Sequence, residues 1–436
     1  MSMVDLITLL IVAAWIAGLA RLAFVGLALK GSRQVGDLRR ILAAGEAAGG
    51  SASVPLPPLS VIVTARDEVD GIEETVGRLL AQDYPGLEVV VIDDRSTDGT
   101  GEILDRLAAE HAAAGHGRLT VIHNRELPAG WLGKCHACRL GAERARGEWL
   151  LFTDGDVALM DRRLLARVVA HAGRQRLDHI AVFPDLRPMS PLQAGLVTTF
   201  GTLFLLGARA YEMDRDRARG GGGVGAFNLV RRSAYDRFGG HRLLSMDLGD
   251  DFKLGRLLKE SGARQRIYDG VDLIRCPWHR GAINVVRGLE KNLFSGFNFS
   301  MLEIIGLTAL LLILGFGAGL CALAVTLLLA CGHGAGAFAG APVPALLAAV
   351  WIPAVGPSIA ALVSYVRESH RFGYNPYVLW AMQPISTLLM LYAAWNSALV
   401  TLLQGGVRWR GTFHPLHELR RGIVPPGAGR RFHPEA

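Results

Sequence analysis

The chain has 436 residues, half of them hydrophobic, and a formal net charge of +7. This hydrophobic share exceeds that of an ordinary soluble protein, and the excess is concentrated in long apolar runs. Five cysteines in so long a chain exclude a disulfide framework. The basic residues gather beside the apolar runs, which favours membrane flanks over a nucleic-acid-binding face and predicts no nucleic-acid partner.

Residues 1–30 are predicted to form an N-terminal transmembrane anchor. The run 6–29 is almost continuously apolar and is long enough to cross a bilayer as a helix. It carries Asp5 rather than a basic residue at its front, which disfavours a cleaved signal peptide. Basic residues beginning with Lys30 follow, so the positive-inside rule places the amino terminus outside and the next domain in the cytoplasm. Residues 31–58 are expected to be a linker.

Residues 59–300 are predicted to form a cytoplasmic α/β domain. Short β-branched or apolar runs alternate there with segments of helical periodicity, and the expected strands are residues 59–64, 87–92, 119–122 and 149–153. Strands that alternate with helices predict a Rossmann-like, mostly parallel sheet covered on both faces. In such sheets ligands bind outside the carboxyl ends of the strands.

Acidic residues follow three of these strands directly. They are Asp67 and Glu68, then Asp93 and Asp94, and finally Asp154 and Asp156. Carboxylates at one edge of a sheet repel one another unless cations or hydrogen-bond donors lie between them. Asp-x-Asp at a strand end suits a hard divalent cation, which in turn can bridge phosphates. A single Asp-Gly-Asp is equally typical of a polar turn, so the prediction depends on the three sites together.

These segments resemble, in order, the motifs of family 2 glycosyltransferases, which have the GT-A fold. The matching segments are residues 61–68, 91–99, 133–134, 152–156 and 249–254. The anchor before the domain, the apolar segments after it and the ending 405–411 look like the lipid-glycosylating branch of that family. This branch includes hopanoid-associated, carotenoid and ceramide glycosyltransferases.

The resemblance implies a donor site and a metal site. The donor-binding residues would be Ala65, Arg66, Asp67, Glu68, Asp93, Asp94, Lys134 and Asp154. Asp154 and Asp156 would hold Mn²⁺ or Mg²⁺ on the donor diphosphate. Arg280 and Lys291 are the candidates for a further basic group that grips this diphosphate.

The resemblance also implies a catalytic base and an acceptor pocket. Asp251 would be the general base, with Asp250 beside it. The acceptor pocket would be shaped by Gly225, Phe227 and Asn228. A positioned carboxylate that takes the proton of an incoming hydroxyl contributes about 10²–10⁴ in rate. Attack opposite the leaving group inverts the anomeric centre.

The remaining apolar segments predict a membrane region over residues 301–404, followed by a basic tail over residues 405–436. The segments lie near residues 304–331, 343–366 and 377–403. Four full crossings would leave the arginine-rich tail outside, so one segment is expected to be re-entrant or interfacial. A shorter apolar stretch, residues 192–206, is expected to be an interfacial helix, with a buried core helix as the alternative.

These features together predict an inverting, metal-dependent transfer of one sugar from a nucleotide sugar, by default a UDP-sugar, to a membrane lipid hydroxyl. The protein would be multi-pass in the inner (plasma) membrane. A processive polysaccharide synthase of the same fold is one alternative, disfavoured because no Gln-x-x-Arg-Trp follows the predicted base. A non-enzymatic membrane transporter or scaffold is the other. Cys135 and Cys138, in a lone Cys-x-x-Cys, are expected to be structural.

Overall fold

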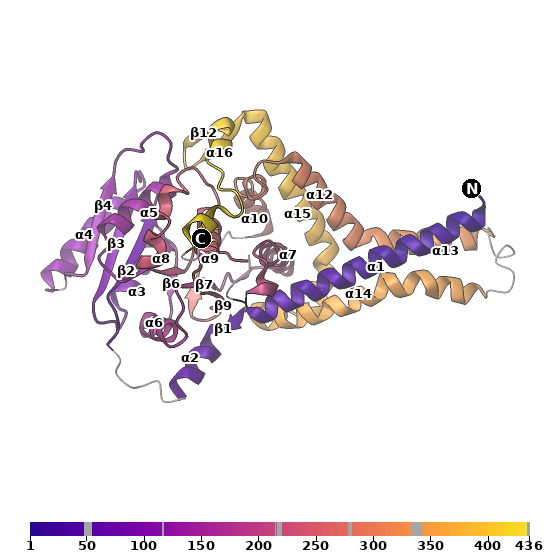
Figure 1. Ribbon diagram of the computed structural model, residues 1–436, viewed down its shortest axis with the longest axis horizontal. Helices are drawn as coiled ribbons and strands as arrows, with labels where there is room; N and C mark the ends of the chain where they lie inside the picture. Colours follow the sequence, from indigo (N-terminus) through magenta and orange to yellow (C-terminus); the bar gives the residue numbers. More distant parts are fainter. Residues whose placement is uncertain are drawn as a thin grey trace.

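The protein consists of an α/β domain and a long helical stalk that leaves it on one side (Figure 1). The computed structural model describes residues 1–47, 55–115, 117–213, 215, 220–277, 281–332 and 342–433. The amino terminus lies at the far end of the stalk, and the carboxyl-terminal segment lies back against the α/β domain (Figure 1).

An eight-stranded sheet forms the centre of the domain. In spatial order its strands are β1 (Gly36–Asp37), β9 (Gln265–Asp269), β7 (His179–Phe183), β8 (Asn228–Arg231), β5 (Trp149–Asp154), β2 (Leu59–Ala65), β3 (Leu87–Asp94) and β4 (Leu119–Asn124). Neighbouring strands are parallel except β8, which runs antiparallel to β5 and β7. The predicted Rossmann-like, mostly parallel sheet is confirmed, and its four expected strands correspond to β2, β3, β4 and β5.

Helices cover both faces of the sheet, as the nearly continuous apolar strands require. They are α3 (Ile72–Leu80), α4 (Thr100–Ala113), α5 (Gly133–Arg144), α6 (Leu164–Arg174), α8 (Arg232–Asp236) and α9 (Asp250–Glu260). Successive residues of β2 point to opposite faces. Val61 and Val63 pack in the cluster that contains α3 and α6, whereas Ile62 packs in the cluster that contains α5, α8 and α9.

Part of the range predicted as a linker is regular structure. The first helix, α1 (Met3–Gln34), continues four residues past the predicted end of the anchor at residue 30. It is followed by β1, which pairs with β9, and by α2 (Leu38–Ala47). Leu38 and Leu42 are buried in the domain core. The spacing of Leu38 and Leu42 gives α2 an apolar face that packs on α6. The composition of residues 31–58 did not predict this helix.

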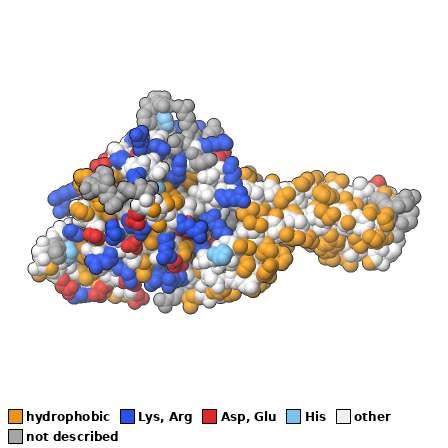
Figure 2. Space-filling view, turned by 90° about the horizontal axis from the view of Figure 1, so that it is seen from below, with side chains coloured by type: hydrophobic (Ala, Val, Ile, Leu, Met, Phe, Trp, Pro, Cys, Tyr) orange, Lys and Arg blue, Asp and Glu red, His pale blue; other side chains and the backbone are white. Residues whose placement is uncertain are grey.

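Four helices among the described residues are long and apolar enough to cross a membrane. They are α1, the continuous helix made of α12 (Met301–Leu312), a π-helical turn η3 (Ile313–Gly317) and α13 (Ala318–Ala330), then α14 (Val343–Phe372) and α15 (Pro376–Gln404). The stalk consists of α1, α13 and α14, which pack against one another (Figure 1). Hydrophobic side chains cover its surface, while charged side chains gather on the domain (Figure 2).

The helix α15 differs from the stalk helices in what it packs against. It lies along α7 (Pro191–Gly207), α10 (Ala282–Leu289) and α11 (Leu293–Gly296), at the side of the domain. Half of its most apolar stretch is buried inside the protein, against 22% for α1. Both α14 and α15 continue through internal prolines, so the prolines do not break these helices.

Two arginines at the end of α14 fasten the stalk to the domain. Arg367 donates hydrogen bonds to Ser32 and to the carbonyl of Val35, at the carboxyl end of α1. Cations at this position satisfy the last carbonyls of a helix and favour its dipole. Arg371 donates to the carbonyl of Pro184 in the domain, 3.2 Å away. The bases of α1 and α14 are therefore held together at the domain surface.

The carboxyl-terminal segment returns to the domain from the end of α15. It contains a hairpin of β11 (Gly406–Trp409) and β12 (Thr412–Pro415), then α16 (Leu416–Arg421) and the short η4 (Ala428–Phe432). Its residues Leu419 and Val424 are buried. The smaller remaining elements are η1 (Ala210–Glu212), η2 (Gly240–Arg242) and the pair β6 (Ala158–Leu159) and β10 (Ile274–Arg275).

Candidate active site

Charged residues from three distant segments meet at one point beside Gly225. A Cβ atom on this glycine would lie 2.7 Å from Asp251 Oδ2, 2.9 Å from Asp154 Oδ2 and 3.2 Å from Lys134 Nζ. Only a residue without a side chain leaves these three groups so close together. They line one small cavity, with Thr64, Cys138, Phe152, Thr153, Asn228, His241, Asp250 and Leu254.

The elements around the sheet edge explain how these side chains meet. Asp154 ends β5, and Lys134 lies in the first turn of α5, so that Lys134 Nζ is 2.7 Å from Asp154 Oδ1. Asp250 and Asp251 form the first turn of α9, where carboxylates are favoured by the helix dipole. The Asp251 carboxylate accepts a hydrogen bond from the amide of Phe252 through Oδ1, which leaves Oδ2 facing Gly225.

Asp250 is the most deeply buried carboxylate of this group, with 4% of its surface exposed. Burial raises its pKa to about 7, the nearby Lys134 ammonium opposes this, and the Asp251 carboxylate adds to it. A buried carboxyl group with a raised pKa, next to a second carboxylate, is a frequent feature of active sites.

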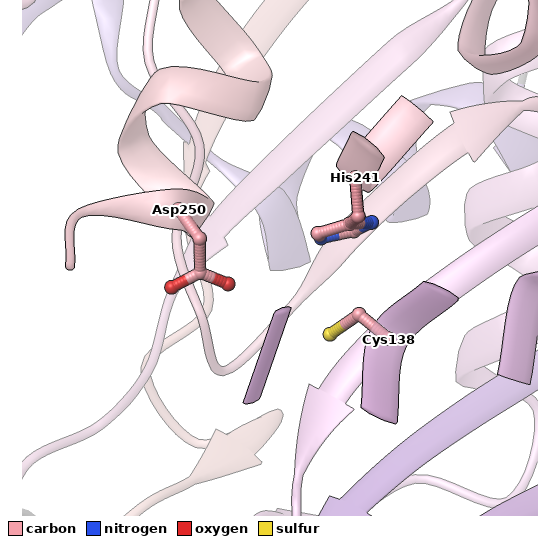
Figure 3. A group of neighbouring side chains, drawn as sticks. All are labelled: Cys138, His241 and Asp250. Carbon is pink, nitrogen blue, oxygen red and sulfur yellow. The ribbon is translucent and has the colours of Figure 1, made fainter. Parts of the chain in front are cut away.

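Cys138 and His241 surround Asp250 (Figure 3). One ligand-type atom from each of the three residues lies within 4.8 Å of the others. Burial raises the pKa of the Cys138 thiol and lowers the pKa of His241 to about 3, so both side chains are neutral. Nδ1 of His241 is already hydrogen-bonded to the Tyr235 hydroxyl at 2.8 Å. These neutral groups help to bury Asp250 without supplying a positive charge, and burial is the main cause of its raised pKa.

Asp154 and Asp156 fit a hard divalent cation better than that buried group does. Burial, together with the carboxylates of Asp154 and Glu68, raises the pKa of Asp156 to about 6. A cation between these oxygens would relieve their repulsion, and carboxylate oxygens are the ligands that Mg²⁺ and Mn²⁺ prefer. Glu68 lies close to this group, because its Cγ is 3.2 Å from the position of a Cβ on Gly155.

The ends of β2 and β3 form a second part of the site. Asp67 Oδ1 accepts a hydrogen bond from the amide of Thr97 at 2.8 Å. Asp94 accepts from Asn124 at 2.7 Å and forms an ion pair with Arg95 at 2.8 Å. Both carboxylates are thus fixed in place by neighbouring groups.

Three further residues predicted to bind the donor, Asp93, Ala65 and Arg66, lie at the ends of β2 and β3. Asp93 bonds to His123 Nδ1 at 2.8 Å and raises the pKa of that imidazole, so Asp93 links the end of β3 to β4. Ala65 is buried at the end of β2, where only its backbone can approach a ligand. Arg66 Nη1 lies 3.9 Å from Asp94 Oδ2.

Lys291, one of the two candidates for the additional basic group, faces the carboxylates of the cavity. Burial and then the charge of Lys134 lower its pKa to about 8, against the opposing effect of the Asp250 and Asp154 charges. Its Nζ lies 3.9 Å from the centre of the Trp409 ring, a cation–π contact. The other candidate, Arg280, lies outside the described residues.

The predicted acceptor residues lie on different faces of the chain before and within β8. Gly225 and Asn228 line the cavity. Asn228 donates to the carbonyl of Asp251 at 3.3 Å, so it positions the predicted base. Phe227 is fully buried in the sheet core and is not among the residues that line the cavity, so its acceptor role stays a prediction.

Several residues of the site were not predicted from the sequence. Cys138 and His241 surround Asp250, and Asn124 fixes Asp94. Arg410, in the hairpin after α15, donates to Glu68 Oε1 at 2.6 Å. Asn124 is the last residue of β4, so its position at a strand end, which identified the acidic residues, could also have identified it. The other three have no such signal because their contacts depend on the tertiary fold.

Comparison with known proteins identifies the domain. Residues 60–239 match the model of glycosyl transferase family 2. The chain is similar to a 4,4'-diaponeurosporenoate glycosyltransferase of Staphylococcus haemolyticus, with 23% identity over 55% of this chain and 61% of the relative. It is also similar to a beta-monoglucosyldiacylglycerol synthase of Synechocystis, with 32% identity over 33% of this chain and 30% of the relative. The matches thus span less than two thirds of these relatives.

Among solved structures, the chain is similar to a mannosyltransferase from Pyrobaculum calidifontis in complex with GDP-Man and Mn²⁺. The TM-score is 0.51 at 19% identity, over 90% of this chain and 99% of the other. At this identity the likeness establishes the fold. The ordered motifs, the sheet topology and the matching family model show that residues 60–239 form a glycosyl transferase family 2 domain within a GT-A-like fold.

Proposed function

We propose that this protein transfers one sugar from a nucleotide sugar, by default a UDP-sugar, to the hydroxyl group of a membrane lipid, with inversion and with the help of Mn²⁺ or Mg²⁺. The observation that carries the proposal is the meeting of Asp154, Lys134 and Asp251 around Gly225. One carboxylate for a cation, one ammonium and one free carboxylate oxygen are the groups that glycosyl transfer requires.

Each group has a defined task in this mechanism. Asp251 Oδ2 takes the proton of the attacking hydroxyl, while the amide of Phe252 and the side chain of Asn228 keep Asp251 in place. The departing diphosphate gains negative charge, and the ammonium groups of Lys134 and Lys291 stabilise it. A cation held by Asp154 and Asp156 would add Lewis-acid stabilisation at the same phosphates. The acceptor attacks opposite the diphosphate, which inverts the anomeric carbon.

An apolar surface next to the predicted base supports a lipid acceptor. The Phe204 ring of α7 contacts the Phe252 ring, with centroids 5.0 Å apart, and Phe252 follows Asp251 directly. The helix α7 lies between the domain, α15 and the stalk. An acyl chain or another apolar group entering along α7 would bring its hydroxyl toward Asp251. One relative's name specifies diacylglycerol and another's diaponeurosporenoate, which agrees with an apolar acceptor.

We further propose three membrane crossings by the stalk, with α15 lying at the inner surface. Three crossings from an outside amino terminus place the bases of α1 and α14, the α/β domain and the tail together in the cytoplasm. The packing of α15 on α7, α10 and α11 supports an interfacial position. Its exposed residues include Tyr377, Trp380 and Tyr392, and aromatic side chains of this kind are typical of the membrane interface. This arrangement removes the conflict of four full crossings.

The test is release of nucleoside diphosphate by the purified protein in detergent, with a panel of nucleotide sugars and a bacterial lipid extract. Release that requires both lipid and divalent metal, and that is lost in Asp251→Asn, is the expected result. Asp236→Asn, which changes an exposed carboxylate on α8, serves as the matched control. If no donor in the panel is turned over or bound in the presence of Mn²⁺ or Mg²⁺, the proposed function is wrong.

A further inference from the structure

The hairpin of β11 and β12 reaches the donor site from the end of α15. α15 ends at Gly405 with a φ of 70°, and β11 begins at the next residue. The two-residue loop of the hairpin consists of Arg410 and Gly411. Val407 and His414 on its strands are buried, which fixes the hairpin against the domain. The hairpin therefore places its loop residue Arg410 at the edge of the central sheet.

Arg410 makes two short contacts there. Its Nη1 donates to the carbonyl of Arg66 and its Nη2 donates to Glu68 Oε1, each at 2.6 Å. These contacts join residues more than 340 positions apart in the chain. The guanidinium has five N–H donors, and 43% of the side chain remains exposed. Donors therefore remain for a ligand while Glu68 holds the arginine in place.

The position of Arg410 is unfavourable for an arginine. Its φ is 46° and that of Gly411 is 77°, both in the left-handed region. Two-residue hairpin loops with positive φ at both positions favour Asn followed by Gly. Asn would thus suit the turn better than Arg. An arginine held in a strained conformation against a carboxylate of the site indicates a functional constraint.

Three guanidinium groups gather at this edge. The charges of Arg95 and Arg410 contribute to a lowered pKa of Arg66, after the larger effect of burial. Asp94 and Asp67 oppose this shift. Nε of Arg66 is buried and has no hydrogen-bond partner among the described residues. A cationic cluster with donors to spare, next to the carboxylates of a predicted cation site, is complementary to an anion with several oxygens.

We propose that Arg410 is a donor-binding residue that, with Arg66, clamps the diphosphate of the nucleotide sugar, and that the hairpin closes this end of the donor site. This inference rests on the proposed function, because it assigns a ligand to the same donor site. The hairpin also places Trp409 against Lys291, so one short segment positions two cations at the diphosphate. Since α15 leads directly into the hairpin, donor binding is tied to the helix that lies along α7.

The test uses Arg410→Asn, a substitution that suits the turn and removes the guanidinium. Arg408→Gln is the matched control, because Arg408 is an exposed residue of the same hairpin whose guanidinium stacks on Phe413. Affinities for UDP, GDP and the corresponding nucleosides are measured by calorimetry and competition on the full-length protein with Mg²⁺. Arg410→Asn should weaken diphosphate binding roughly 10- to 100-fold, the effect of a lost charge-assisted hydrogen bond. The diphosphate affinity of Arg410→Lys should lie between those of wild type and Arg410→Asn.

Nucleoside affinity separates a phosphate contact from a structural role. Nucleoside affinity should be unchanged in Arg410→Asn. The affinity of Arg408→Gln for every ligand should stay within about twofold of wild type. Equal losses for nucleoside and diphosphate, or diphosphate binding within twofold of wild type, would overturn the inference and leave the proposed function standing. A wild-type protein that binds neither UDP nor GDP would overturn both.

Discussion

The two parts of the candidate site differ in how their carboxylates are neutralised. At the end that we propose binds the nucleotide, Asp67 and Asp94 are already bonded to a backbone amide, a side-chain amide and a guanidinium group. At the reacting end, Asp156 and Asp250 have raised pKa values of about 6 and about 7. The first end is organised before any ligand arrives. At the second end Lys134 pairs with Asp154, and the other carboxylates make this end suited to a cation and a reacting substrate.

The largest effect is expected from the carboxylate that faces Gly225. Asp251→Asn removes the proton acceptor but preserves the shape of the site, and we expect the transfer rate to fall about 10²- to 10⁴-fold. Donor affinity should change little, because the nucleotide end is organised separately. Initial rates and donor dissociation constants measure the two ends independently. Similar losses in both would contradict the proposed division of the site.

The next largest effect concerns the cation at the reacting end. Asp156 carries its negative charge above a pKa of about 6 and is protonated below it, so cation affinity should fall as the pH decreases through 6. Asp156→Asn should lower the transfer rate about 10²-fold and remove this pH dependence. Titration of activity with Mn²⁺ at several pH values measures both effects. Asp272→Asn, at a surface ion pair, is the control, and an unchanged metal requirement in Asp156→Asn would refute the assignment.

A smaller effect is expected from Lys291. Its ammonium is charged below a pKa of about 8 and neutral above it, so attraction for the donor diphosphate should weaken as the pH rises through 8. We expect the donor KM to rise about tenfold over this range, the loss of one charged contact. Lys291→Arg keeps the charge and should move this rise to higher pH. If the donor KM of Lys291→Arg depends on pH in the same way as that of wild type, a group other than Lys291 titrates.

The smallest effect is expected at the organised nucleotide end. Asn124→Ala removes one hydrogen bond to Asp94 but leaves the ion pair with Arg95. We expect nucleoside affinity to fall about three- to tenfold, the value of roughly 1 kcal/mol for one hydrogen bond. The transfer rate at saturating donor should stay the same. A large loss of rate instead would mean that the two ends are coupled.

Much of the sheet and of the acidic edge could be predicted because the signals are local. Each strand is a short apolar run, and the residues after parallel strands necessarily meet at one edge. The expected helix at residues 192–206 is α7 to within one residue at each end, helped by Pro191 in the first turn and by Ser190, which caps it. These features need only neighbours in sequence.

The contacts that were not predicted are long-range or depend on which face a residue occupies. Arg410 and Glu68 are 342 residues apart, and no periodic pattern connects a turn with the end of a strand. Phe227 and Asn228 are adjacent, yet one faces the core and the other faces Asp251. Hydropathy identified α15 as apolar but could not show that α7 covers it, because hydropathy describes composition and not what covers a helix.

The central claim is most directly tested by following the sugar itself. The full-length protein is incubated with a radiolabelled nucleotide sugar that supports diphosphate release, a lipid extract and Mn²⁺, and the lipid phase is analysed for label and for the number of sugars per lipid. We expect label in the lipid phase, in a product with one sugar, formed by wild type and by Asp236→Asn but not by Asp251→Asn. Label found only in free sugar or in a water-soluble polymer would contradict it.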